Sequence, residues 1–194
     1  EERREIAHCV DLVVEAFENG GRLFYVGAGT SGRLGVLDSA EMPPTYGTDP
    51  DLVQGIIAGG REALVVAQEG AEDRPEHGAR AIDEHGVRAG DFVLGIATSG
   101  TTPYVHGALA RAREIGARTG FLLCTYPTVS LREINALIHV ENELIDEAVG
   151  KMMRWLGERG RDGDTDVLYT SDHGELQGDF GLLFKGPYHT EALL

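Results

Sequence analysis

Two short segments of the chain combine glycines with hydroxyl side chains, residues 27–32 and residues 98–102. Each follows an apolar run and precedes a run with helical spacing, so each is predicted to link a strand to a helix. The first N–H groups of a helix lack partners within it, and the helix dipole favours negative charge there by about 0.3–1 kcal/mol at an exposed site. Thr30, Ser31 and Ser99 would add hydroxyl donors. This combination suits a phosphorylated small molecule with many hydroxyl groups.

The first segment also fits the G-x-G-x-x-G pattern of dinucleotide sites. Such a site needs an acid at the end of the next strand, about 20 residues further on. The strand expected over residues 52–58 ends in glycines instead, and Asp49 and Asp51 precede it, which disfavours a dinucleotide. Residues 1–127 contain no lysine, so a P-loop is excluded. The other alternative is a glycine turn that only packs a helix against a strand.

The elements that must position these segments alternate along the chain. The expected helices are residues 1–17, 62–68, 79–85 and 104–115, and the expected strands are residues 23–26, 52–58, 92–97 and 120–124. Such alternation predicts an α/β fold in which three layers surround a parallel sheet with right-handed crossovers, and both hydroxyl-rich segments lie along one edge of that sheet. Residues 42–50 are expected to form a Pro-rich loop long enough to reach over a ligand.

Charge and composition exclude some partners. The net charge of −15 disfavours nucleic acid or an anionic membrane surface as a partner. No signal peptide and no apolar run of about 18 residues is visible, so we expect a cytoplasmic protein with no membrane contact. Cys9 and Cys124 are too few for a disulfide framework and are expected to be buried thiols. The chain begins without methionine, and we expect both of its ends to be cut.

Five segments in order carry the pattern of a known family. They are Gly-Ala-Gly-Thr-Ser-Gly-Arg-Leu-Gly (27–35), Glu-Met-Pro-Pro-Thr (41–45), Leu-Val-Gln-Gly with Ile-Ala-Gly-Gly (52–60), Glu-Gly-Ala-Glu-Asp (69–73), and Ser-Gly with Thr-Pro-Tyr (99–104). Through these segments, residues 1–127 resemble the sugar isomerase (SIS) domain and in particular the N-acetylmuramic acid 6-phosphate etherases. The resemblance implies a Rossmann-like SIS-type domain, a sugar-phosphate substrate, no cofactor, and a homodimer with its site near the interface.

The resemblance also implies which residues hold the substrate. These are Gly29, Thr30, Ser31, Gly32 and Arg33 in the first segment, and Ser99, Gly100, Thr101 and Thr102 in the second. One position departs from the family pattern, because the etherases usually carry arginine where this chain has Thr101. This chain therefore offers a hydroxyl rather than a guanidinium to the phosphate or sugar at that position.

Cleavage of a lactyl ether at C3 of an amino sugar is an elimination, in which a base removes the proton at C2 and an acid protonates the departing oxygen. Two carboxylates in different protonation states would suffice, each contributing roughly 10²–10⁴-fold. Glu41 is expected one or two turns beyond the first segment, and Glu72 follows the second strand, so both are expected to face one crevice. From the residues alone the simpler interpretations are a charge at a helix end for Glu41 and part of a solvated face for Glu72. The resemblance implies Glu41 as proton donor and Glu72 as base.

The rest of the chain has a different character. Residues 131–156 are predicted to form a long amphipathic helix, and residues 167–170 a short strand. In residues 143–150, 169–175 and 181–187 this part is similar to the C-terminal part of sulfatases and phosphonate monoester hydrolases. That similarity implies Asp172 and His173 as ligands of a divalent metal and Lys185 facing the sulfate or phosphate. The nucleophile motif and the early pair of aspartates of that family are absent.

The sequence therefore predicts an incomplete SIS-type domain over residues 1–127 and a sulfatase-like fragment over residues 128–194, which forms a helix-strand appendage. In another interpretation, the second part packs onto the first as one more unit of the same sheet. The expected activity is that of an N-acetylmuramic acid 6-phosphate etherase, a carbon-oxygen lyase. Two alternatives stay open: a sugar-phosphate sensor without catalysis, and metal-dependent ester hydrolysis by the second part.

Overall fold

The computed structural model describes residues 2–124, 134–139, 154 and 158. The chain divides into two units, Glu1–Val140 and Glu141–Leu194, and all the elements that follow belong to the first. In chain order they are α1 (Glu2–Glu18), β1 (Leu23–Gly27), α2 (Gly29–Tyr46), β2 (Val53–Ile57), the short 3₁₀ helices η1 (Gly60–Leu64) and η2 (Ala71–Asp73), α3 (Pro75–Glu84), β3 (Phe92–Ile96), α4 (Pro103–Ile115), β4 (Arg118–Leu123) and β5 (Ala136–His139).

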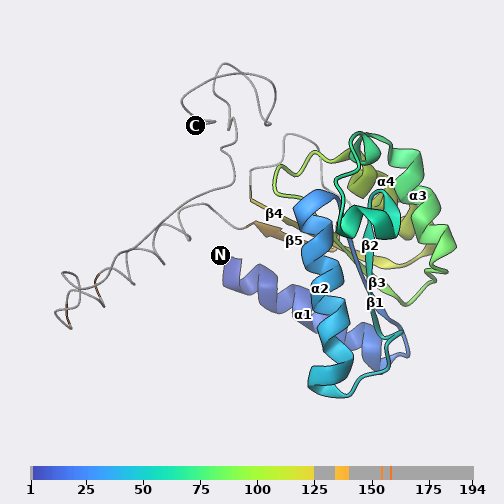
Figure 1. Ribbon diagram of the computed structural model, residues 1–194. Helices are drawn as coiled ribbons and strands as arrows, with labels where there is room; N and C mark the ends of the chain where they lie inside the picture. Colours follow the sequence, from blue (N-terminus) through green and yellow to red (C-terminus); the bar gives the residue numbers. More distant parts are fainter. Residues whose placement is uncertain (1, 125–133, 140–153, 155–157, 159–194) are drawn as a thin grey trace. The chain divides into compact units, whose positions relative to one another are not determined.

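Five parallel strands form one sheet in the order β2-β1-β3-β4-β5 (Figure 1). The sheet is covered on both faces, which explains why its central strands are almost continuously apolar: four of the five residues of β3 are buried. The predicted three-layer α/β fold with a parallel sheet is therefore confirmed.

Alternate residues of each strand point to opposite faces, and each face has its own core. On one face, Phe24, Val93 and Phe121 pack against α3 and α4. On the other face, Leu23 and Phe92 pack against α1 and α2. Cys9 of α1 is part of this second core, so its predicted burial is confirmed, whereas Cys124 is only half-buried. Helix α1 covers one face of the sheet, as its apolar spacing predicts.

A buried carboxylate holds the beginnings of β1 and β3 together. Asp91 is fully buried and accepts hydrogen bonds from the backbone N–H groups of Arg22 (2.9 Å) and Arg88 (2.9 Å). The Arg22 guanidinium pairs with the same carboxylate at 2.8 Å. These contacts fix the edge of the sheet opposite to the one at which the hydroxyl-rich loops emerge.

Helix α2 continues through the segment that the sequence predicted to be a Pro-rich loop. It includes Pro43 and Pro44 and ends at Tyr46, and Gly47 caps it in the left-handed conformation (φ 66°). The fixed φ of proline suits a helix, and each of these prolines, within the last four residues of α2, removes one hydrogen bond to the carbonyl four residues earlier and crowds that carbonyl. The predicted loop over the ligand is therefore wrong.

Three predicted helices differ from the structure. The helix expected over residues 62–68 is the short 3₁₀ helix η1, and α3 begins at Pro75 rather than at residue 79. Within the helix expected over residues 131–156, residues 136–139 instead form β5, which is paired with β4. A short apolar run fits the spacing of a helix as well as that of a strand. Here the run pairs with the open edge of β4 and is therefore a strand. The sheet thus includes residues beyond 127, the end predicted for the first domain.

Candidate functional site

The first hydroxyl-rich loop is a turn that only glycine can make at two positions. A Cβ atom at Gly27 would lie 2.6 Å from the nitrogen of Gly32, and a Cβ at Gly32 would lie 2.6 Å from Cγ1 of Ile57. Gly29 has a positive φ of 54°. The chain therefore reverses sharply at the end of β1 and enters α2 at once.

The first turn of α2 presents its backbone donors to the outside. Ala28 precedes the helix in an extended conformation, and no side chain in the described part of the protein caps the helix. The first intrahelical bond joins the N–H of Gly32 to the carbonyl of Ala28 (3.2 Å), so the N–H groups of Gly29, Thr30 and Ser31 precede the ladder. The Thr30 side chain is exposed and Ser31 is half-buried. Together these groups can hold an anion such as a phosphate.

Close packing fixes the direction of α2. A Cβ atom at Gly35 would lie 2.7 Å from Cβ of Tyr25, so the helix lies directly against β1. Burial and a hydrogen bond to the carboxylate of Asp38 raise the pKa of the Tyr25 hydroxyl, which therefore stays protonated and ties β1 to α2.

The second hydroxyl-rich loop follows β3 and leads into α4. Gly100 is buried with a φ of 68°, and Pro103 occupies the first turn of α4, where its missing N–H costs nothing. Thr101 donates from both its backbone N–H (3.3 Å) and its hydroxyl (3.0 Å) to the Oγ of Ser99. Thr101 therefore orders Ser99, and it supplies no cation at this position.

The two loops leave neighbouring strands at the same edge of the sheet. Gly27 of β1 is paired in register with Ile96 of β3. The following helices diverge, because α2 covers one face and α4 the other. This is a topological switch point, where open α/β sheets form their ligand crevice. The predicted placement of both loops along one edge is confirmed.

Two side chains stabilise these loops from behind. The Nε of Arg33 donates to the carbonyl of Leu64 in η1 (3.2 Å), so this predicted substrate ligand is tied to η1. His106 was not predicted from the sequence. Its Nε2 lies 2.7 Å from the carbonyl of Gly100, and its ring packs edge-on against Phe121. The only signal in the sequence is its place in the first turns of the helix after the loop.

The two predicted catalytic glutamates are not brought together within one chain. Glu41 lies more than three turns into α2, about 18 Å along the axis from Gly29, rather than one or two turns. The adjacent Met42 packs in one core with Leu52 and Val53, at the start of β2. Glu72 lies in η2, which packs against α4. Both glutamates are exposed, and the expected shared crevice does not form from a single copy.

The predicted metal ligands Asp172 and His173, with Lys185, lie outside the described residues. Within the described ranges, no group of three or more His, Cys, Asp or Glu side chains could hold a metal ion. None of the helices in those ranges has both the length and the apolar composition needed to cross a bilayer.

The sequence and the fold of this chain are similar to those of known SIS domains. Residues 5–113, more than half of the chain, match the family described as the glucokinase regulatory protein N-terminal SIS domain. The chain belongs to this SIS-domain family. The same fold occurs in phosphoheptose isomerases: GmhA from Neisseria gonorrhoeae has a TM-score of 0.56 at 19% identity, covering 72% of this chain and 73% of that one. The isomerase from Francisella tularensis has a TM-score of 0.55 at 19% identity, covering 72% and 74%.

Relatives at higher identity confirm the resemblance to the etherases. The SIS domain is 63% identical over 124 residues to N-acetylmuramic acid 6-phosphate etherase from Salinibacter ruber, covering 62% of this chain and 40% of the relative. It is 50% identical over 143 residues to the enzyme of the same name from Rippkaea orientalis, covering 74% of this chain and 45% of the relative. The chain thus spans less than half the length of these relatives.

Proposed function

We propose that this SIS domain belongs to an N-acetylmuramic acid 6-phosphate etherase. Such an enzyme cleaves the lactyl ether of its substrate by elimination and then adds water, which yields N-acetylglucosamine 6-phosphate and lactate. The single observation that carries the proposal is the pair of glycine and hydroxyl loops at the switch point, with the main-chain donors of α2 open between them. The names of relatives at 50–63% identity supply the substrate.

The phosphate is held at the first turn of α2. The N–H groups of Gly29 and Ser31, and the hydroxyls of Thr30 and Ser31, donate to its oxygens, and Ser99 donates from the second loop. Charge-assisted hydrogen bonds of this kind contribute about 1.5–3 kcal/mol each. They act against the net charge of −15, so local donors rather than the overall field must hold the substrate.

The chemistry requires two carboxyl groups, and we assign them to Glu41 as acid and Glu72 as base. The acid protonates the ether oxygen as the lactyl group leaves, and the base removes the C2 proton; water then adds to the unsaturated sugar. Because the two side chains lie far apart in one chain, the assignment requires a second copy that brings its Glu41 to the cleft beside Glu72.

The surface around Glu41 suits such a second copy. Leu34 and Leu37 are 57% and 58% exposed and share one side of α2 with Glu41, at positions i, i+3 and i+7. On α1, which covers the same face of the sheet, Val10 and Val14 are 54% and 46% exposed. Exposed apolar stripes of this kind mark association surfaces. A homodimer through this face would cover them.

Lactate release from N-acetylmuramic acid 6-phosphate tests the proposal. We expect the chain to release lactate, and Glu41→Ala and Glu72→Ala each to reduce the rate roughly 10²–10⁴-fold. Glu18→Ala, at an exposed glutamate at the end of α1, is the matched control and should retain the rate. Ser31→Ala should weaken substrate binding about tenfold, whereas Ser39→Ala, whose hydroxyl donates to the Val36 carbonyl, should not. A chain that neither binds the substrate nor releases lactate would contradict the proposal.

A sugar-phosphate sensor without turnover is the second candidate. It is favoured by Thr101, which stands where the etherases usually carry arginine and is committed to Ser99. Calorimetry with N-acetylmuramic acid 6-phosphate separates the two: saturable binding without lactate identifies a sensor.

A further inference from the structure

A cavity of about 570 Å³ lies beside strand β2, in the space left because α3 packs mainly against α4. Its lining includes residues of β2, η1 and α3, and Tyr104 of α4. No residue of the two hydroxyl-rich loops, 27–32 and 98–102, lines it. A sugar phosphate held by those loops therefore leaves this cavity free. Its volume is that of a small-molecule site.

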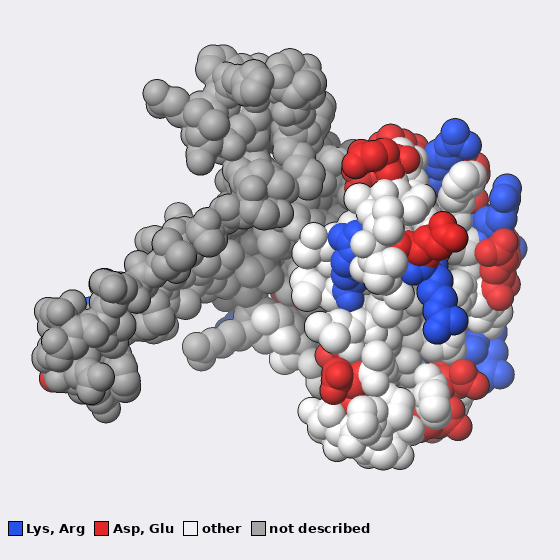
Figure 2. All heavy atoms as spheres, in the orientation of Figure 1, with Lys and Arg blue, Asp and Glu red and all other residues white. Residues whose placement is uncertain are grey.

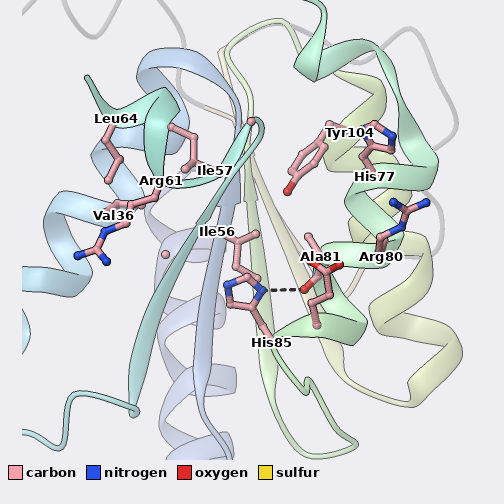
Figure 3. A pocket seen from close by; sticks show the side chains of 14 residues that line it. Val36, Ile56, Ile57, Arg61, Leu64, His77, Arg80, Ala81, His85 and Tyr104 are labelled. Carbon is pink, nitrogen blue, oxygen red and sulfur yellow. Dashed lines mark hydrogen bonds between the residues drawn. The ribbon is translucent and has the colours of Figure 1, made fainter. Parts of the chain in front are cut away.

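Tyr104 supplies a polar group inside the cavity. Its side chain is only 4% exposed, and its hydroxyl is directed into the space between β2 and α3 (Figure 3). No described residue forms a hydrogen bond with this hydroxyl. Burial, followed by the carboxylate of Glu84, raises the pKa of Tyr104 to about 12, so the group is a donor at neutral pH. The hydroxyl faces the cavity, so it can donate to a ligand held there.

The strand beside the cavity has backbone groups that pair with no described residue. The N–H of Leu23 bonds to the carbonyl of Leu52 (2.9 Å), and the N–H of Ala58 bonds to the carbonyl of Gly27 (3.0 Å). In a parallel ladder alternate residues face the neighbouring strand, so these two bonds place even-numbered residues of β2 toward β1. Gly55 and Ile57 therefore direct their N–H and C=O groups away from the described sheet, at the border of the cavity.

Basic side chains surround the mouth. Arg61, His77, Arg80 and His85 are lining residues, against one carboxylate, Glu84. The guanidinium groups of Arg61 and Arg80 extend outward from opposite sides, and the imidazole of His85 lies between β2 and α3 (Figure 3). His85 donates from Nδ1 to the carbonyl of Ala81 (2.8 Å), which leaves Nε2 for a ligand.

Two of these side chains have no carboxylate partner among the described residues. Arg22, Arg111 and Arg118 each pair with a carboxylate, whereas Arg61 and Arg80 form no ion pair with any residue that the structure describes. Figure 2 shows basic side chains over this face, interspersed with acidic ones. In a protein with a net charge of −15, unpaired arginines at the mouth of a cavity favour an anionic ligand.

We propose that this cavity is a second binding site, which takes a small organic acid with an apolar body. The body lies against Ile56 and Ala81, the hydroxyl of Tyr104 donates to a polar atom at the inner end, and the acidic group lies at the mouth on the Arg80 side. The site differs from the phosphate loops, although it borders η1, whose Leu64 carbonyl holds Arg33.

Titration with phenylacetate, followed by the amide shifts of the labelled chain, tests this site. We expect saturable binding, with shifts at Gly55, Ile57 and His85. Tyr104→Phe keeps the buried ring, and it should weaken binding roughly fivefold; Arg80→Gln should weaken it roughly tenfold. Arg111→Gln, at an arginine paired on α4 with Asp83 and Glu114, is the control and should bind as the wild type does.

Three results would overturn the proposal. The first is the absence of saturable binding below about 10 mM. The second is equal affinity for the uncharged 2-phenylethanol, or unchanged affinity in both Tyr104→Phe and Arg80→Gln, which would mean a merely apolar hollow. The third is that the shifts fall on Ser31 and Ser99, which would place the ligand in the sugar-phosphate crevice. Thermal unfolding of each variant checks that the fold is retained. We expect Tyr104→Phe to retain it, because the hydroxyl that it removes has no described partner.

Discussion

Glu41 and Glu72 lie toward opposite edges of the parallel sheet within one chain. Glu41 is next to Met42, which packs with the residues at the start of β2, whereas Glu72 lies in η2 beside α4, whose first turn follows the end of β3. In Figure 1, helix α2 runs from one end of the strands toward the other. A site that uses both carboxyl groups therefore needs two copies of the chain.

This separation predicts complementation between inactive variants. Glu41→Ala and Glu72→Ala are each expected to be inactive alone. After unfolding and refolding of an equal mixture, mixed dimers combine one intact Glu41 with one intact Glu72, so about a quarter of the wild-type lactate release should return. The recovered rate is measured against refolded wild type. Refolded mixtures that stay inactive, while the wild type regains activity, would contradict a shared site.

Gly32→Ala should impair the first loop more than any effect on helix propensity explains. The new Cβ would lie 2.6 Å from the Ile57 side chain and 2.9 Å from the backbone of Gly27, so the turn must open. We expect a loss of about 1–3 kcal/mol in the free energy of unfolding, together with weaker binding of the sugar phosphate. Gly20→Ala, whose Cβ meets nothing within 4 Å, is the control without a close approach, and its φ of 74° adds a strain that position 32 does not carry. Equal effects of both substitutions would show that the close approach is unimportant.

Asp91→Ala should be strongly destabilising. It leaves the Arg22 guanidinium, whose side chain is 21% exposed, without its partner, and it removes the acceptor of two backbone N–H groups. We expect a loss of about 3–5 kcal/mol in urea unfolding. The control is Asp83→Ala, which breaks the exposed pair with Arg111 and should cost at most about 1 kcal/mol. Similar losses in the two variants would contradict the role given to burial.

The thiol of Cys9 predicts a loss of stability in alkali. Burial raises its pKa from 9.0 to about 11, so the folded state holds the proton more tightly than the unfolded chain does. This contribution is fully present below pH 9 and is lost as the pH rises through 11. The difference in free energy of unfolding between the wild type and Cys9→Ala should therefore shift against the wild type over that range. A difference that is independent of pH would show that the thiol is not desolvated.

The sequence predicted the parts of the fold that repeat a clear local pattern. Apolar runs followed by glycine and hydroxyl residues mark β1 and β3, and the N-terminal periodicity marks α1, because in each case local pattern and burial agree. The placement of both loops on one edge follows, because all strands of a parallel sheet end on the same side.

The predictions were wrong where tertiary contacts determine the local structure. Pro43 and Pro44 suggested a loop, yet α2 tolerates them near its end, and this places Glu41 far from the loop it was expected to approach. The apolar run 136–138 joined β4 rather than a helix. The cavity beside β2 could not be predicted, because Arg61, Arg80 and Tyr104 are brought together only by the packing of α3 on α4. Five basic side chains, histidines included, within residues 61–85 of an acidic chain were the available signal.

The open start of α2 has a further consequence for how this protein can diverge. Its anion-holding donors belong to the peptide backbone, so an exchange of a side chain at positions 30 or 31 for any residue but proline leaves them in place. Affinity for a phosphate is thus inherited with the turn itself, while Thr30, Ser31 and Ser99 can be replaced to select among sugars. Domains that descend from this one can lose the reaction and still bind a phosphorylated metabolite.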